Sequence, residues 1–305
     1  MMHTLSTRET PSRRRFLGTS LATCTACLLG EARGLEAAAA ESRFQYCAFT
    51  KFLQSLSFDE LADTIAELGF HGIEGAIRPG GHVEPERVEE DLPRLHKALQ
   101  QRGLEVAIMA SDINRLDQPH TKSVLQTAAN LGISMYRMAY FRYDLTQPVV
   151  KQLDDIRRGL DDLIEFGAKL GITAVYQNHS GTTLLGAPIW DLYELVKNHS
   201  PDHFGVALDI GHTTVEGGIC WPIHVNLMEP YLRAIYVKDF QWNDRHIEWI
   251  PLGEGRIDPE FFAWLKKSDF SGPISVHVEY LGRAGAADHV KALRHDIATL
   301  KNWLE

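Results

Sequence analysis

Cysteine and long apolar runs are both scarce in this sequence of 305 residues, and each scarcity excludes a class of protein. Of the four cysteines, only Cys47 and Cys220 lie beyond the first forty residues, far apart and without CxxC spacing. That pattern supports neither a disulfide framework nor a cysteine metal site. After the N-terminal segment no apolar run approaches the length that crosses a bilayer, so we expect no stable membrane span.

The sequence also lacks a run rich in lysine and arginine, and its overall charge is acidic. The formal net charge is −9, and the first forty residues carry five arginines and three glutamates, so the rest of the chain has a net charge of −11. An acidic chain is repelled by the phosphate backbone of nucleic acids. We therefore expect a small molecule, and not a nucleic acid, as partner.

The first forty residues have the order of segments typical of an export signal. The twin-arginine pattern Ser12-Arg13-Arg14-Arg15-Phe16-Leu17 precedes a weakly apolar run that ends at Gly30, and small residues follow at 37–40. The apolar run is too short to span a membrane. We predict a twin-arginine signal at 1–40, export to the periplasm, and a folded domain at 41–305. A lipoprotein signal acylated at Cys24 or Cys27 is a weaker alternative, because the residues before these cysteines fit a lipidation site poorly.

From Phe44 onward, short apolar runs alternate with amphipathic stretches about eight times, which is the pattern of β-strands alternating with helices. We predict strands at 45–49, 72–77, 105–110, 135–139, 174–177, 205–209, 234–238 and 274–279. Strict alternation implies a parallel sheet covered by helices. Eight units in about 265 residues favour closure into a single (β/α)8 TIM barrel. No GxGxxG follows the first strand, which removes the main argument for a dinucleotide-binding fold.

The stretches between the strands have helical periodicity. Apolar residues recur at spacings of three and four in Phe58-Leu61-Ala62-Ile65-Leu68 and in Leu153-Ile156-Leu160-Leu163. Several predicted helices end at a glycine just before the next strand, where glycine forms a left-handed cap. These glycines are Gly69, Gly103, Gly132 and Gly171.

Polar residues at the carboxyl ends of the strands are the functional candidates, because barrels of this kind carry their chemistry there. In the second strand we expect Glu74 to point into the barrel mouth and bind substrate, with an ion pair to Arg78 or Arg137 as an equal alternative. The fifth strand ends in Gln177-Asn178-His179-Ser180. Four hydrogen-bonding side chains in a row suit a polyol or a metal-bound substrate, whereas capping the next helix would need only one.

The sixth strand ends at an acid, and a histidine follows three residues later. This spacing places Asp209 and His212 over one pocket, where Asp209 could ligate a metal and His212 could ligate it or hold a substrate hydroxyl. In the loop 251–255, Glu254 could fold over the site and bind substrate, although a plain glycine turn is an equal reading of that loop.

The last two strands also end in charged residues. Alternation puts Tyr236 and Lys238 on one face of the seventh strand, and His277 and Glu279 on one face of the eighth. Glu279 is the best single candidate for a catalytic or metal-binding carboxylate.

Over residues 41–305 these motifs together resemble the xylose isomerase-like family of barrels. The motifs that carry the resemblance are Gln177-Asn178-His179, Asp209-Ile210-Gly211-His212, Tyr236-Val237-Lys238-Asp239, Pro251-Leu252-Gly253-Glu254-Gly255 and His277-Val278-Glu279. The family includes sugar isomerases, ketose 3-epimerases, inosose and dehydroshikimate dehydratases, and a branch of abasic-site endonucleases. In its epimerase-like members, Glu, Asp, His and Glu from strands five to eight hold one divalent ion, usually Mn, Mg or Co. The two glutamates move a proton between the two faces of the substrate.

The resemblance assigns three residues directly and departs at two positions. By position, the metal-binding aspartate is Asp209, the last glutamate is Glu279, and the histidine that contacts substrate is His212. The strand-five glutamate is replaced by Gln177 and the strand-seven histidine by Tyr236. Glutamine ligates only through a neutral carbonyl oxygen and cannot serve as a base, and neutral tyrosine is a poor ligand. A symmetric two-carboxylate epimerisation therefore lacks one partner.

Two arrangements of the site remain open. A divalent ion (Mn, Mg or Co) could be held by Asp209, Glu279 and His212 or His277, with water or the carbonyl oxygen of Gln177 completing the shell. Alternatively, Glu279 could act as base without a metal while Lys238 or His212 steadies an enolate-like charge. Either arrangement suits a one-base reaction such as β-elimination or aldose–ketose proton transfer.

The sequence therefore predicts an enzyme that acts on a sugar or cyclitol by removing a proton next to a carbonyl group, as a metal-assisted isomerase or epimerase. A lyase or dehydratase that uses one base on a keto-sugar is the first alternative, and a carbohydrate-binding barrel without catalysis is the second. An abasic-site nuclease is disfavoured because its multi-zinc cluster needs more ligands than these strand ends supply. A homo-oligomer is compatible with the sequence.

Overall fold

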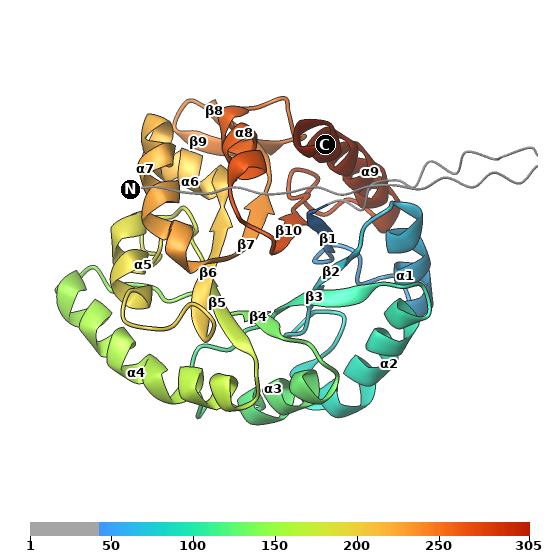
Figure 1. Cartoon of the computed structure of the whole chain (residues 1–305), viewed down its shortest axis with the longest axis horizontal. Coiled ribbons are helices and arrows are strands. Elements are labelled where there is room, and N and C mark those ends of the chain that lie inside the picture. The colour runs from blue at the N-terminus through green and yellow to red at the C-terminus, as the bar shows by residue number, and fades with distance from the viewer. Residues whose placement is uncertain (1–42) are drawn as a thin grey trace, which may run out of the picture. The chain divides into compact units, whose positions relative to one another are not determined.

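Eight parallel strands close on themselves around one axis, and helices form an outer ring around them (Figure 1). The computed structural model describes residues 43–305, so the predicted twin-arginine signal lies outside the described residues. The strands are β1 (Gln45–Phe49), β2 (Gly72–Ala76), β3 (Glu105–Ala110), β4 (Met135–Arg137), β5 (Thr173–Gln177), β6 (Phe204–Asp209), β7 (Leu232–Val237) and β10 (Pro273–Val276). They follow one another around the barrel in this order, and β10 pairs with β1. The predicted single (β/α)8 TIM barrel is confirmed.

Helices connect the strands on the outside of the barrel (Figure 1). They are α1 (Phe58–Glu67), α2 (Val88–Gln100), α3 (Thr121–Asn130), α4 (Val149–Lys169), α5 (Ile189–Val196), α6 (Ile210–Gly217), α7 (Trp221–Met228), α8 (Glu260–Lys267) and α9 (Ala286–Leu304). Short 3-10 turns occur at η1 (Pro85–Arg87), η2 (Gly218–Cys220) and η3 (Glu229–Tyr231). Between residues 43 and 305, none of these helices is both long and apolar enough to cross a membrane.

Local sequence signals explain where the helices begin and end. At the start of α1, the side chain of Ser57 accepts from the backbone of Glu60, and the side chain of Glu60 accepts from the backbone of Ser57. The four predicted glycine caps have φ values between 70° and 78°, a conformation that other residues adopt only with strain. The left-handed caps are thus confirmed.

Four strands end earlier than predicted, among them β2 by one residue at Ala76 and β4 by two residues at Arg137. The seventh ends at Val237, so that Lys238 lies just beyond it, and the eighth ends at Val276, which leaves Glu279 in the following loop. The backbone N–H of His277 still donates to the carbonyl of Val237 at 3.0 Å, after which the chain leaves the ladder. Both charged side chains therefore belong to the rim of the barrel and not to its wall.

An antiparallel hairpin between β7 and α8 is absent from the sequence-based prediction. It consists of β8 (Asp239–Asn243) and β9 (His246–Ile250), and its turn contains Asp244 at φ 53°. Figure 1 shows it at the top of the view, beside α6 and α8. The hairpin extends the chain directly from the carboxyl end of β7.

The interior of the barrel has an apolar layer and a polar layer. The apolar layer is small and consists of Cys47, Ile108, Val175, Ala207, Ala234 and Tyr236. Towards the carboxyl ends of the strands the inward side chains become polar and stay buried: Glu74, Arg137, Gln177, Asp209, Lys238 and His277. Buried charges are stable only when they are paired and hydrogen-bonded, so this layer must be an ordered network.

Candidate active site

The predicted functional residues gather at the carboxyl end of the barrel. Asp209, Lys238 and Glu279 come from the ends of the neighbouring strands β6, β7 and β10, and they form one ion cluster. The Nζ atom of Lys238 lies 2.8 Å from Oε2 of Glu279 and 3.3 Å from Oδ2 of Asp209. The Nζ atom of Lys51 lies 3.4 Å from the other oxygen of Glu279. A single ammonium group thus lies between the two carboxylates of the site.

Burial and charge set the protonation of this cluster. Burial alone would lower the pKa of Lys238, but Asp209 and Glu279 outweigh it and raise that pKa above its usual value. Burial would likewise raise the pKa of Glu279, but Lys238, His277 and Lys51 hold it well below its usual range. Both groups are therefore charged at neutral pH. With an exposed fraction of 17%, the Glu279 side chain is accessible to a ligand, whereas Asp209 is fully buried.

The hairpin covers this cluster with an aromatic ring. Nζ of Lys238 lies 4.4 Å from the centre of the Trp249 ring, and the same ring meets that of His212 edge-on at 5.0 Å. Trp249 comes from β9, so a residue that sequence reasoning missed forms the cover of the site. The sequence signal for the hairpin is weak: Phe240 and Trp242 alternate with polar residues, and Trp249 follows seven residues later.

Gln177 joins two parts of the polar layer. Its amide nitrogen donates to Oδ2 of Asp209 at 2.8 Å, and its carbonyl oxygen accepts from Nη1 of Arg137 at 3.1 Å and from the hydroxyl of Tyr140. The neighbouring Asn178 donates to the carbonyl of Asp209 at 3.1 Å and accepts from its N–H at 2.7 Å. Both amides are thus engaged in positioning Asp209.

Glu74 lies deeper, and the structure decides between its two alternative partners. It pairs with Arg137, whose Nε lies 3.0 Å from Oε1, while Oε2 accepts from Ser275 and from Nε2 of His277, each at 2.7 Å. Burial would raise the pKa of Glu74, but His277 and Arg137 lower it to about 2. The predicted role in substrate binding stays a prediction, since both of its oxygens are already bonded within the protein.

Two histidines lie beside the ion cluster. The Nδ1 atom of His212 is 2.7 Å from the hydroxyl of Ser180, and its Nε2 atom is buried without a hydrogen-bond partner among residues 43–305. His179 stacks on His212 with ring centres 3.7 Å apart, and its Nδ1 donates to the carbonyl of Ser180 at 2.8 Å. Burial and the charge of Lys238 lower the pKa of His179 to about 4 and that of His212 well below its usual value. Both rings are neutral at physiological pH and can accept hydrogen bonds from hydroxyls.

The loop 251–255 is held by Asp239, which follows Lys238 directly. The carboxylate of Asp239 accepts from the backbone N–H groups of Gly253 and Gly255 at 3.0 Å, and from those of Arg256 and Ile257 at 2.8 and 3.1 Å. Glu254 itself is exposed in a groove with Tyr280 and His295. Its predicted role in substrate binding stays a prediction, and the structure places it apart from the ion cluster.

The residues predicted to hold a metal do not fit one. Oδ2 of Asp209 faces the amide of Gln177 and the ammonium of Lys238, and Oε2 of Glu279 faces the same ammonium. A divalent ion between these carboxylates would be repelled by Lys238, and the carbonyl oxygen of Gln177 is turned toward Arg137. Within residues 43–305 no three His, Cys, Asp or Glu side chains are arranged to hold a metal ion.

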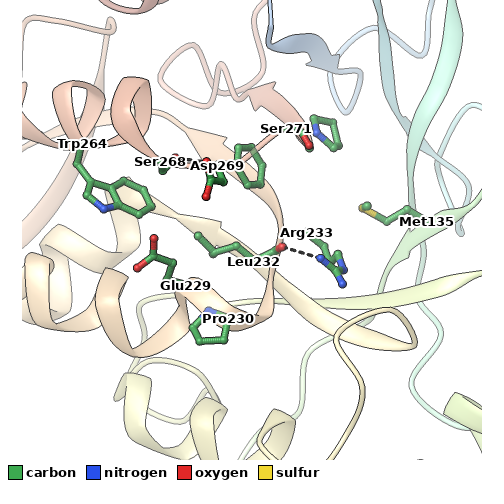
Figure 2. A pocket seen from close by; sticks show the side chains of 12 residues that line it. Met135, Glu229, Pro230, Leu232, Arg233, Trp264, Ser268, Asp269 and Ser271 are labelled. Atoms are coloured by element: carbon green, nitrogen blue, oxygen red, sulfur yellow. Dashed lines mark hydrogen bonds between the residues drawn. The ribbon is translucent and has the colours of Figure 1, made fainter. Parts of the chain in front are cut away.

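A separate pocket of about 490 Å³ opens at the opposite end of the barrel (Figure 2). It is lined by Met135, Leu232 and Pro273, the first residues of β4, β7 and β10. Arg233, which lies in this pocket, is engaged in bonds to the carbonyl of Pro201 and to Asp202. Conserved chemistry in barrels belongs to the other end, so this pocket is not the candidate active site.

Comparison with known proteins agrees with this geometry. The family model described as "Xylose isomerase-like TIM barrel" matches residues 62–303. A search of curated proteins finds no matching relative.

Several solved structures share the fold. The probable 3-DHS dehydratase of petrobactin synthesis from Bacillus anthracis superposes with a TM-score of 0.67 at 16% identity, covering 86% of this chain and 99% of that one. An L-ribulose 3-epimerase gives 0.66 at 16% identity, with 86% and 94% covered. The 3-keto-D-glucoside 4-epimerase from E. coli gives 0.64 at 16% identity, with 85% and 99% covered. At these identities the likeness establishes the fold and leaves the reaction open.

Proposed function

The chain belongs to the xylose isomerase-like TIM barrel family, and from this premise we propose that it is an enzyme that removes a proton next to the carbonyl group of a sugar or cyclitol. The observation that carries the proposal is the pair of Lys238 and Glu279, 2.8 Å apart at the carboxyl rim of the barrel. Structures of similar fold are named as sugar epimerases and as a dehydratase, which is consistent with a substrate of this class.

Glu279 is the base in this proposal. It is ionised at neutral pH and partly exposed, whereas Glu74 and Asp209 are fully buried and bonded within the protein. Its carboxylate takes the proton from the carbon next to the carbonyl, and the electron pair of the C–H bond moves onto the carbonyl oxygen. The ammonium of Lys238 stabilises the negative charge that develops there, because it lies beside the base in a site largely shielded from water.

A cation that belongs to the chain thus occupies the position between the two carboxylates, and no step of the proposed mechanism passes through a metal. Lys238 provides one positive charge, and Asp209 keeps it in place at 3.3 Å. The neutral ring of His179 is half-buried and is placed to accept a hydrogen bond from a substrate hydroxyl, and the buried ring of His212 packs behind it with ring centres 3.7 Å apart.

The number of bases restricts the reaction. Epimerisation with two bases needs a second carboxylate on the opposite face, and Gln177 cannot serve because an amide does not take up a proton at neutral pH. Glu279 returns its proton on the same face to the former carbonyl carbon, while the proton of the adjoining hydroxyl moves to the former carbonyl oxygen, which yields aldose–ketose isomerisation. β-Elimination is the second candidate, because protonated Glu279 can donate its proton to a hydroxyl group on that face, which then leaves as water.

Solvent exchange tests this proposal directly. The protein is incubated in D2O with a panel of aldoses, ketoses, keto-sugars and inososes, with and without EDTA, and the sugars are followed by NMR. Deuterium should appear at the carbon next to the carbonyl group. Glu279→Gln should reduce the exchange rate by at least about 10²-fold, and Glu165→Gln, an exposed glutamate paired with Lys169 on α4, serves as the matched control.

The outcomes separate the alternatives. Exchange that persists in Glu279→Gln excludes this residue as the base. Sugar binding without any exchange supports a carbohydrate-binding barrel without catalysis. Exchange that EDTA abolishes and Mn restores contradicts the internal-cation arrangement.

A further inference from the structure

One arginine at the mouth of the barrel forms no ion pair with any carboxylate among residues 43–305. Arg78 lies two residues after β2, is half-buried, and its guanidinium carbon is 5.7 Å from the centre of the Phe49 ring. Arg137 lies over the same ring at 5.5 Å. The guanidinium of Arg78 forms no hydrogen bond or ion pair within residues 43–305, whereas Arg137 is paired with Glu74.

The other cations at the mouth are all neutralised. Lys238 lies between Asp209 and Glu279, and Lys51 pairs with Glu279. Arg78 is therefore the one of these four cations that contacts no carboxylate directly, and Glu74 and Asp112 act on it only from a distance. Burial, followed by repulsion from Arg137, lowers the pKa of Arg78, so its surroundings disfavour the charge it carries.

A half-buried charge without a partner destabilises the folded chain, and a bound anion would relieve this cost. Phe49 shields one side of Arg78 from water and packs against His277 with ring centres 4.5 Å apart, which places Arg78 at the edge of the polar layer. A ligand whose reacting carbon meets Lys238 and Glu279 would extend across the mouth toward this arginine.

We propose that Arg78 binds a carboxylate of the substrate, so that the substrate is a sugar acid or cyclitol acid and not a neutral sugar. This inference rests on the proposed function for the reacting end of the molecule. A carboxylate carries one negative charge, which matches the single unpaired guanidinium, and its two oxygens suit the planar fork of that group. A phosphate monoester carries a charge of about −1.5 to −2, more than one guanidinium neutralises.

Matched pairs of probes test the proposal by calorimetry. We would compare D-glucuronate with D-glucose, D-galacturonate with D-galactose, and quinate with myo-inositol. In at least one pair the acid should bind about tenfold or more tightly, because hydrogen bonds between charged groups are the strong ones. In Arg78→Gln that advantage should disappear while the affinity for the neutral member stays unchanged. Arg142→Gln is the matched control, because Arg142 is an exposed arginine bonded to Thr183.

A second measurement does not depend on a variant. Phenylglyoxal should modify Arg78 in the unaltered protein, and the acid probe, but not its neutral counterpart, should protect the peptide that contains it in a mass-spectrometric map. Arg78→Gln should also melt at the same or a higher temperature, since it removes a charge without a partner, whereas a merely structural arginine would lower the melting temperature.

The two proposals fail in different ways. Equal affinity for acid and neutral probes in every pair, or an acid preference that survives in Arg78→Gln, overturns the inference even when neutral sugars undergo deuterium exchange. An Arg78-dependent acid preference without any exchange leaves the inference standing and removes the proposed reaction.

Discussion

The ammonium of Lys238 provides the sharpest test of how this site is built. In Lys238→Met the side chain keeps its approximate length and loses its charge, so the carboxylates of Asp209 and Glu279 lose the ammonium that lies between them. The lysine is 3% exposed and Asp209 is fully buried, and removing one partner of such a pair costs about 3–5 kcal/mol. We expect a loss of that size in the free energy of unfolding at neutral pH, measured by urea denaturation.

The pH dependence of this loss has a definite sign. In the unaltered protein the pKa of Glu279 is held below its usual value, so this group contributes stability above its unfolded pKa of about 4.5 and loses it as the pH falls through its lower folded value. Without Lys238 less positive charge opposes the burial of Glu279, so its folded-state pKa rises. The variant should therefore recover part of its lost stability as the pH falls toward about 5, where Glu279 takes up a proton.

Lys51→Met is the matched control, because Lys51 pairs with the same glutamate at 3.4 Å and its side chain is 39% exposed. Partly exposed pairs contribute about 0–1 kcal/mol, so this variant should unfold almost like the unaltered protein. Two results would refute the reasoning. One is a loss in Lys238→Met that is no larger than in Lys51→Met, and the other is a loss that is independent of pH.

Mn²⁺ should also raise the melting temperature of Lys238→Met alone, since only there are the carboxylates free to bind it.

Two further predictions concern the cover of the site. Trp249→Ala removes the ring 4.4 Å from Lys238, a contact of about 1 kcal/mol within the protein, so the variant should lose about that much free energy of unfolding in urea denaturation; unchanged stability would contradict a covering role. Asp239→Asn weakens the bonds to the backbone N–H groups of residues 253–257, so the variant should lose about 2 kcal/mol of stability and those amides should exchange faster with solvent; unchanged protection would contradict the clamp.

Much of the fold could be predicted because each local signal agreed with the others. The glycine caps, the apolar spacing of the helices and the short buried strands all follow from interactions between residues near in sequence. The hairpin was not predicted because most of its residues are exposed or half-buried and several are polar. Without the pairing of β8 with β9, the sequence around Trp249 looks like a loop. The ends of β7 and β10 were placed too late because Lys238 and Glu279 continue the alternation after the backbone has left the sheet.

The members of the site could be predicted, but their pairings could not. Asp209 and Glu279 were expected at the ends of the sixth and eighth strands, yet whether a metal or the ammonium of Lys238 lies between them depends on distances of a few ångströms in three dimensions. The same holds for Glu74, for which Arg78 and Arg137 were equal partners until the structure paired it with Arg137. That choice left Arg78 outside the ion pairs formed within residues 43–305, a fact that no sequence pattern contains.

Lys238 and Asp239 are consecutive residues with different roles. Lys238 belongs to the ion cluster, and Asp239 holds the loop after the hairpin through hydrogen bonds. A single peptide unit therefore couples the charge of the site to the position of residues 253–257. Substitutions on the outer half of the hairpin leave this unit in place. Insertions or deletions next to Asp239 shift the lysine as well, so this part of the chain tolerates an exchange of side chains better than a change of length.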